Sequence, residues 1–265
     1  MSGSAREVRI EIGGLRAALE TEGGELTALA ERRYAGFLSR ARPDWRFRVG
    51  RREHGLVPLA DVVVRQPHGT GRIELERHDF LATLDVRRRV GDVALGAMDE
   101  IALDAFVRVA YSIALLDAGA LLLHASSVAR DGRGYVFPGR SGSGKTTVTR
   151  LSPGATLLSD ELSIVGRDGR CYGTPFWGEL ARAGENRSVP AAGLYLLRQA
   201  DHHAATPLRA PQALAALLPN VVFFARDPGL VARVFDVAAD VVERVPCLDL
   251  AFRRDPGFWD VIQRD

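Results

Sequence analysis

The chain has 265 residues, of which 46% are hydrophobic and 26% charged, and its formal net charge is +2. This balance is typical of a globular protein of one large or two modest domains. The near-cancelled charge argues against a nucleic-acid-binding protein that works through a strongly basic face. The most apolar segment is well short of the ~20 residues that a transmembrane helix needs, and the N-terminus lacks a signal-peptide pattern. We therefore expect a cytoplasmic protein with no nucleic-acid or membrane partner.

The two cysteines, Cys171 and Cys247, lie 76 positions apart in the sequence. This distance is not a metal-ligand spacing, and two cysteines do not make a dense disulfide framework. We expect two thiols in a reducing compartment.

Residues 1–95 predict a small β-rich module. Apolar residues alternate with polar ones, or form short apolar runs, at 8–12, 45–49, 62–64, 73–75 and 80–86, which predicts strands. Between residues 24 and 37, apolar residues recur at helical spacing after Gly23 and Gly24. The module itself indicates no ligand.

Residues 96–265 predict a second domain of α/β type. Asp99 can cap a helix whose apolar face runs over 101–116, with Gly119 as its stop. An apolar run at 121–125 predicts a buried strand, and a shorter one at 135–137 leads into a glycine-rich turn. The alternation of strand and helix favours a layered α/β domain around a largely buried sheet.

The glycine-rich turn matches the phosphate-binding pattern G-x-x-x-x-G-K-[ST] at every fixed position. The residues are Gly139, Arg140, Ser141, Gly142, Ser143, Gly144, Lys145 and Thr146, followed by Thr147. Glycines let backbone N–H groups wrap around phosphate oxygens, Lys145 can reach the β- and γ-phosphates, and the Thr146 hydroxyl can ligate Mg²⁺. Lys145 is the only lysine, since the other 34 basic residues are arginine. The segment predicts binding of ATP with Mg²⁺.

A phosphate-binding loop needs an acidic residue on a neighbouring strand that holds Mg²⁺ or orients the nucleophile. The apolar run 155–158 predicts such a strand, and it leads to Asp160 and Glu161. Asp160 follows Lys145 by only fifteen positions. Most proteins with this loop place the acid much further along the chain. The short spacing therefore reduces the number of P-loop families to which the chain could belong.

His124 before the loop, the loop itself and the close Asp160-Glu161 pair resemble the HPr kinase/phosphorylase-like family. Its catalytic domain shares a nucleotide site with the phosphoenolpyruvate carboxykinases. The resemblance covers roughly residues 100–200. It implies a P-loop kinase domain with a mixed sheet of that type over 96–265, after the β-rich module 1–95. Here Glu161 replaces the family's second aspartate, and its later Glu-Arg-Gly signature has no clean copy. Glu179 lies at about that place and is the candidate for a further metal-site acid.

The resemblance implies transfer of the γ-phosphoryl group of ATP to a serine hydroxyl of a protein or peptide acceptor. The N-terminal module, which the resemblance does not cover, is our candidate for helping to bind this acceptor. Asp160, His124 and Lys145 would be catalytic, and Thr146, Asp160, Glu161 and Glu179 would surround the metal. The sequence does not divide the roles of general base and metal ligand between Asp160 and Glu161. A protonated His124 beside the base would keep it ionised.

Several alternatives stay open. The chain could phosphorylate a small-molecule hydroxyl, hydrolyse ATP without an acceptor, or bind a nucleotide as a regulatory or scaffold module. The sequence does not identify the acceptor, and it does not say whether the reverse reaction, phosphorolysis, also occurs. The oligomeric state is open, and a homo-oligomer is one possibility. Weaker candidates for phosphate contacts are three arginines, for which a surface position is favoured: Arg140, Arg182 and Arg187. The pair His202-His203 predicts a loop, and Trp177, Trp259, Phe223 and Phe224 indicate core or adenine-side packing.

Overall fold

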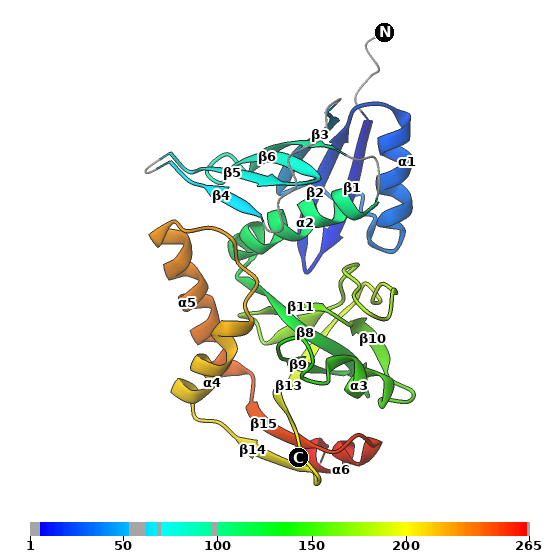
Figure 1. The fold of residues 1–265 in the computed structure, drawn as a ribbon, viewed down its shortest axis with the longest axis vertical. Helices are drawn as coiled ribbons and strands as arrows, with labels where there is room; N and C mark the ends of the chain where they lie inside the picture. The colour runs from blue at the N-terminus through cyan, green and yellow to red at the C-terminus, as the bar shows by residue number, and fades with distance from the viewer. Residues whose placement is uncertain (1–5, 53–61, 68–69, 97–99, 264–265) are drawn as a thin grey trace. The chain divides into compact units, whose positions relative to one another are not determined.

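A computed structural model describes residues 6–52, 62–67, 70–96 and 100–263 (Figure 1). The chain forms two compact units, which comprise Met1–Ala118 with Phe223–Ala232, and Gly119–Val222 with Arg233–Asp265. A β-rich N-terminal unit and mixed sheets confirm the predicted α/β class. The division after Ala118 differs from the expected boundary after residue 95, because the helix that follows packs on the N-terminal sheet.

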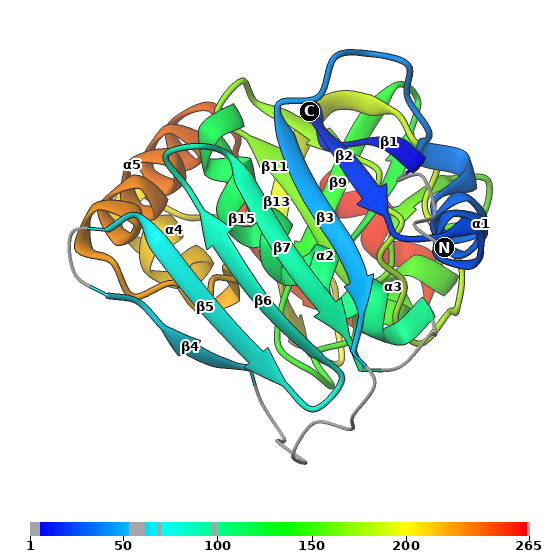
Figure 2. The same cartoon turned by 90° about the horizontal axis from the view of Figure 1, so that it is seen from above.

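The first unit is built on a seven-stranded sheet in the order β1-β2-β3-β7-β6-β5-β4 (Figure 2). Its strands are β1 (Arg6–Ile12), β2 (Leu15–Thr21), β3 (Trp45–Arg51), β4 (Val63–Arg65), β5 (Arg72–Arg77), β6 (Phe80–Asp85) and β7 (Val90–Leu95). β3 runs parallel to both β2 and β7, and the other pairs are antiparallel. The five predicted strands are confirmed, and β2 and β7 are additional.

Two helices pack against the sheet of the first unit. α1 (Gly24–Arg33), followed by η1 (Ala35–Phe37), is the crossover that the parallel pair β2–β3 requires. α2 (Glu100–Ala114) and η2 (Leu115–Ala118) end at Gly119, whose φ of +67° is the left-handed conformation that favours glycine. Phe106 of α2 packs edge-to-face on Phe47 of β3, with ring centroids 5.4 Å apart. The predicted cap Asp99 lies outside the described residues.

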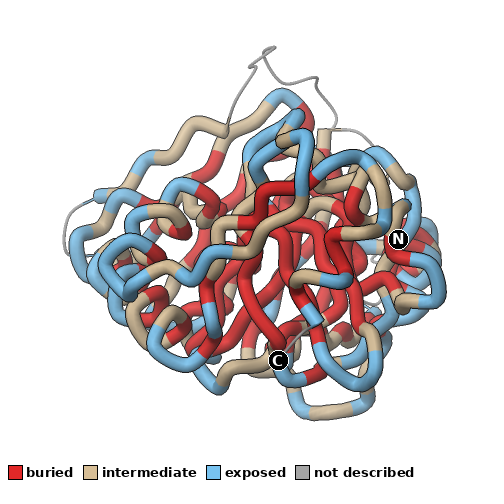
Figure 3. The backbone as a smooth tube through the Cα atoms, turned by 90° about the horizontal axis from the view of Figure 1, so that it is seen from below, coloured by how far each residue is buried: buried red, intermediate tan, exposed pale blue. Residues whose placement is uncertain are grey.

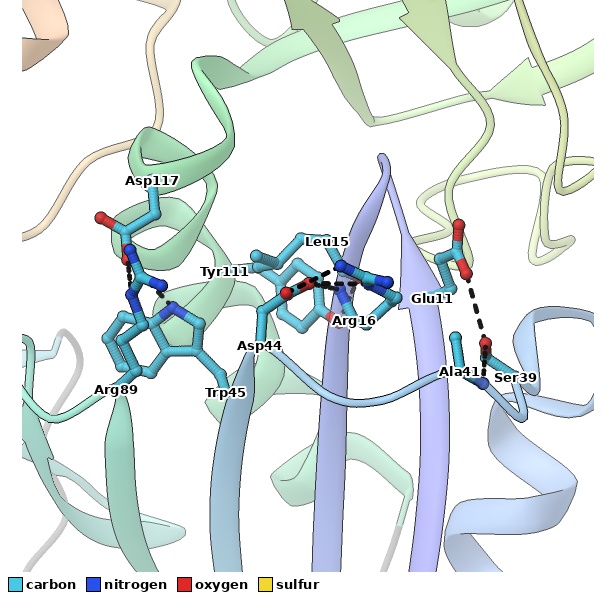
Figure 4. Close-up of polar contacts among 10 residues, drawn as sticks. All are labelled: Glu11, Leu15, Arg16, Ser39, Ala41, Asp44, Trp45, Arg89, Tyr111 and Asp117. Atoms are coloured by element: carbon cyan, nitrogen blue, oxygen red, sulfur yellow. Dashed lines mark hydrogen bonds and ion pairs between the residues drawn. The ribbon is translucent and has the colours of Figure 1, made fainter.

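Polar contacts at one end of this sheet tie its strands to the connecting segments (Figure 4). Arg16 of β2 makes a two-pronged ion pair with Asp44, with both N–O distances 2.9 Å. Asp117 accepts from the Trp45 indole at 3.3 Å and pairs with Arg89 at 3.0 Å. These contacts hold the connection into β3 against β2 and η2.

The second unit contains an eight-stranded mixed sheet in the order β10-β8-β11-β12-β13-β15-β14, with β9 paired to β8 and β13. Its strands are β8 (Ala120–Arg130), β9 (Arg133–Pro138), β10 (Thr156–Ser159), β11 (Leu162–Gly166), β12 (Arg170–Tyr172), β13 (Ser188–Gln199), β14 (Ala204–Pro207) and β15 (Cys247–Phe252). β13 is parallel to β9 and β15. β8 pairs with β11 through Ala120–His124, and beyond His124 it pairs with β9 through Ala125–Arg130 and with β10 through Ser127–Ala129, so its partners change directly after His124.

The remaining helical segments are short, apart from one. They are α3 (Lys145–Arg150), α4 (Ala210–Leu217), η3 (Leu218–Asn220), α5 (Pro228–Arg244), η4 (Pro256–Phe258) and α6 (Trp259–Ile262). Trp259 is a core residue, because it is 4% exposed and packs edge-to-face on Tyr135 at 4.8 Å. Buried residues, red in Figure 3, run through the interior of the chain. On β8, His124 is the one exposed position. Among the helices described, none combines the length and hydropathy needed to cross a lipid bilayer.

Candidate functional site

The second unit contains a cavity of about 610 Å³ that gathers most of the predicted site. Its lining residues are His124, Arg140, Ser141, Gly142, Gly144, Lys145, Thr146, Thr147, Asp160, Glu161, Gly178, Glu179, Gln199, Pro219, Asn220 and Arg254. Of the predicted site residues, Gly139 and Ser143 lie off this lining. Residues that are up to 130 positions apart in the chain therefore surround one space.

The loop 139–146 leaves β9 and enters α3, as its strand–turn–helix context predicts. Gly142 and Gly144 adopt φ values of +80° and +109°, which L-residues with side chains rarely adopt. Gly144 also lies against the buried ring of Phe252, where an added Cβ would stand 2.5 Å from Cζ. Glycine at position 144 is thus required by backbone conformation and by packing.

The Lys145 side chain folds back into the curve of this loop. Its Nζ donates hydrogen bonds to the main-chain oxygens of Gly139 at 2.8 Å and Arg140 at 3.0 Å. Burial lowers the pKa of Lys145, and the charge of Glu161 opposes that shift. The ammonium group therefore lies where a bound anion would meet the loop, within electrostatic range of Glu161.

Main-chain hydrogen bonds place the loop, His124 and Glu161 at one junction. The N–H of Gly139 donates to the oxygen of His124 at 3.1 Å, and the N–H of Ala125 donates to the oxygen of Glu161 at 3.0 Å. Ser126, fully buried, donates from its hydroxyl to the oxygen of Lys145 at 3.1 Å. The change of partner along β8 thus brings these predicted residues together.

Asp160 and Glu179 occupy different positions at this site. Asp160 is 3% exposed, and its Oδ1 and Oδ2 accept hydrogen bonds from the N–H groups of Gly178 at 3.0 Å and Leu180 at 2.7 Å. Glu179 lies between those two residues, and its exposed carboxylate pairs with Arg150 of α3 at 3.2 Å. Asp160 therefore holds the main chain that carries Glu179 to the cavity.

Four lining residues have no motif that marks them in the sequence, namely Gln199, Pro219, Asn220 and Arg254. Gln199 ends β13 and donates from Nε2 to the oxygen of Gly142 at 3.0 Å. Arg254 donates to Oε1 of Gln199 at 3.4 Å. Asn220 reaches the cavity because Val221 forms an antiparallel bridge with Leu123, next to His124.

A family model described as SynChlorMet cassette protein ScmC matches residues 97–264, which is more than half of the chain. The chain belongs to the ScmC family. Every residue that lines the cavity lies within the part of the chain that matches this family. No curated protein matches the chain.

The three arginines that are weaker candidates for phosphate contacts differ in whether they line the cavity. Arg140 lines the cavity, whereas Arg182 and Arg187 do not, and Arg187 pairs with Glu185 at 3.6 Å. His203 lies in a loop, as predicted, and its Nε2 is 2.8 Å from Asp255 Oδ1. Arg140 is thus the one of these three arginines that remains a phosphate-contact candidate.

The thiols of the ScmC-matching region lie outside the site. Cys171 and Cys247 are buried and form no disulfide, and burial raises the pKa of their thiols to about 12 and about 11. Such thiols stay protonated at neutral pH and are poor nucleophiles.

The donor chemistry of the cavity suits Mg²⁺. The Thr146 hydroxyl and the carboxylates of Glu161 and Glu179 line it, and Mg²⁺ prefers oxygen ligands. No group of three or more His, Cys, Asp or Glu residues that could hold a metal is present in the described ranges. A magnesium ion here would therefore take a few protein oxygens and complete its coordination with phosphate oxygens and water, as it commonly does.

Proposed function

We propose that the chain is an ATP-dependent kinase that transfers the γ-phosphoryl group, with Mg²⁺, to a serine hydroxyl of a protein or peptide acceptor. Its second unit would be a P-loop domain of HPr kinase type. The observation that supports this most is that Lys145, His124 and the Asp160-Glu161 pair line one cavity around a glycine-rich loop. Phosphoryl transfer depends mainly on positioning and on charge stabilisation, which these groups supply.

The residues of the cavity have distinct tasks in this proposal. The N–H groups of the loop bind the phosphate oxygens, and Lys145 neutralises charge that develops between the β- and γ-phosphates. Lys145 exchanges its hydrogen bonds to the oxygens of Gly139 and Arg140 for phosphate oxygens. Oxygens of Thr146 and of the Asp160-Glu161 pair would hold Mg²⁺, which when bound would draw charge from the same phosphates.

The transfer step balances without a further reactant. The acceptor oxygen forms a bond to the γ-phosphorus, the bond from that phosphorus to the bridging oxygen breaks, and ADP leaves. The hydroxyl proton passes to a carboxylate of the acid pair at the tip of β10. His124 lies next to this pair through the main chain, because it pairs with Leu162 and the N–H of the following residue, Ala125, donates to the oxygen of Glu161.

The proposal is tested with γ-labelled ATP, Mg²⁺ and a library of serine peptides, with matched peptides in which alanine replaces serine. We expect label on serine peptides with the wild type, and none with Lys145→Ala or Glu161→Gln. Circular dichroism and thermal melting serve as controls for folding of the variants.

Other outcomes would replace this function by another. ATP binding without any transfer would indicate a nucleotide-binding regulatory or scaffold module. Steady phosphate release without an acceptor would indicate an ATPase. Label that appears only on small hydroxyl compounds would indicate a small-molecule kinase.

A further inference from the structure

Asp160 and Glu161 are neighbours in sequence, yet the structure gives their carboxylates different surroundings. Both oxygens of Asp160 accept main-chain hydrogen bonds, one from Gly178 and one from Leu180, and the residue is 3% exposed. Hydrogen bonds to an ionised acceptor are about twice as strong as neutral ones. The Asp160 carboxylate is therefore committed to the turn 178–180.

Glu161 lines the same cavity as the phosphate-binding loop. Lys145 lines this cavity too, and the charge of Glu161 opposes the lowering of the Lys145 pKa by burial. The main-chain oxygen of Glu161 accepts from Ala125, directly after His124. Glu161 is also less buried than Asp160. Its carboxylate borders the cavity beside the turn 178–180, since a Cβ added at Gly178 would stand 3.0 Å from Oε2 of Glu161.

The turn 178–180 contacts both acids, Asp160 through hydrogen bonds and Glu161 through packing. An added Cβ at Gly178 would stand 2.9 Å from the Cβ of Glu161, so the turn packs directly on the Glu161 side chain. Glu179 lies between the two N–H groups that Asp160 binds, and it lines the cavity. Fixing this turn therefore fixes the surroundings of Glu161 and the position of Glu179.

We propose that Asp160 is a positioning residue that fixes the turn 178–180, and that Glu161 is the acid that contacts the bound metal–nucleotide. This assignment rests on the proposed function, and it divides the roles that the sequence leaves open. If Asp160 turned to bind the metal, two N–H groups beside a buried carboxylate would lose their acceptors, which is unfavourable. Glu161 can contact the metal without breaking these bonds.

The first test compares the isosteric variants Asp160→Asn and Glu161→Gln by site-resolved amide hydrogen exchange in the absence of nucleotide. In Asp160→Asn, we expect the amides of Gly178 and Leu180 to exchange at least about tenfold faster, because they lose a charged acceptor. In Glu161→Gln, their exchange should match the wild type. Unchanged exchange in folded Asp160→Asn would overturn the positioning role.

The second test measures the affinity of a fluorescent ATP analogue with Mg²⁺ and with EDTA. Glu161→Gln should lose most of the gain in affinity that Mg²⁺ provides. Asp160→Asn should lose a smaller part of it, because Asp160 acts on the metal site only through the turn 178–180. The reverse pattern would overturn the assignment. If the wild type does not bind the nucleotide analogue, the proposed function is contradicted. The exchange test uses no nucleotide and would still decide the role of Asp160.

A third measurement uses the wild type alone and so does not depend on the folding of any variant. Adding ATP with Mg²⁺ should leave the amides of Gly178 and Leu180 protected, because Asp160 keeps its hydrogen bonds. Faster exchange at these two amides on binding would show that Asp160 leaves the turn for the ligand, and would overturn the proposal.

Discussion

The ring of Phe252 lies directly against Gly144, so that a Cβ added at Gly144 would stand 2.5 Å from Cζ of Phe252. Phe252 ends β15, is 1% exposed and packs edge-to-face on Phe258. The phosphate-binding loop therefore packs on a rigid part of the core. A side chain at position 144 cannot be accommodated by movement of a flexible neighbour.

Replacing Gly144 by alanine should lower the free energy of unfolding by about 2–5 kcal/mol, because overpacking and an unfavourable positive φ act together. Nucleotide binding should be lost with it. Gly142→Ala is the matched control, since Gly142 also has a positive φ but an added Cβ meets nothing within 4 Å. It should cost only about 1–2 kcal/mol. Equal costs in chemical denaturation would contradict the packing argument.

Nucleotide affinity should fall as the pH rises on the alkaline side of neutrality. Burial lowers the pKa of Lys145 below its ordinary 10.5, so the ammonium loses its proton before an exposed lysine would. Bound phosphates favour the charged form, and binding therefore weakens as the pH passes through this lowered pKa. The measurement is the dissociation constant of a fluorescent ATP analogue between pH 7 and about 10.

The control for this pH dependence is Lys145→Arg, whose guanidinium stays charged up to about pH 12. Its affinity for nucleotide should be lower than that of the wild type but independent of pH over the same range. An alkaline decline of equal size in Lys145→Arg would show that another group is responsible.

Gln199→Ala should weaken nucleotide binding roughly two- to tenfold with little change in stability, because Gly142 loses one hydrogen bond of about 0.5–1.5 kcal/mol. Gln199→Glu keeps the shape but places a carboxylate against the oxygen of Gly142 and near the phosphates. We expect a larger loss of affinity for the glutamate variant than for alanine in isothermal titration. Affinities equal to that of the wild type in both variants would exclude a role for Gln199 in shaping the loop.

Asp104→Ala should destabilise the first unit by about 3–5 kcal/mol, because the buried side chain of Arg33, 1% exposed, would lose the carboxylate of Asp104 with which it pairs. Arg108 would also lose its 2.7 Å bond to Asp104. Asp92→Ala removes the carboxylate of an exposed pair with Arg48 and should change stability by less than about 1 kcal/mol. Chemical denaturation of both variants tests the difference, and similar losses would contradict it.

The sequence alone determined the features that are contiguous in the chain. Loop 139–146, with the strand before it and the helix after it, follows from local spacing, and so does the strand that leads to Asp160 and Glu161. Where apolar and polar residues alternate, a strand with one buried face was equally visible: β3 alternates buried and exposed residues from Trp45 to Val49. β7 has a similar burial pattern but was not predicted, because Gly91 takes one of its buried positions and Val90 and Ala94 are apolar on the other face. β2 was not predicted either, because it is buried at adjacent positions such as Ala17, Ala18 and Leu19, and therefore lacks alternation.

Tertiary structure decided what lies around the loop. Gln199 contacts Gly142 across 57 positions, and Arg254 follows a strand that pairs in parallel with β13. Such pairings depend on how distant segments bury one another, and no local pattern encodes them. The different surroundings of Asp160 and Glu161 arise in the same way, because only the folded chain brings the N–H groups of Gly178 and Leu180 to one carboxylate and Lys145 within range of the other.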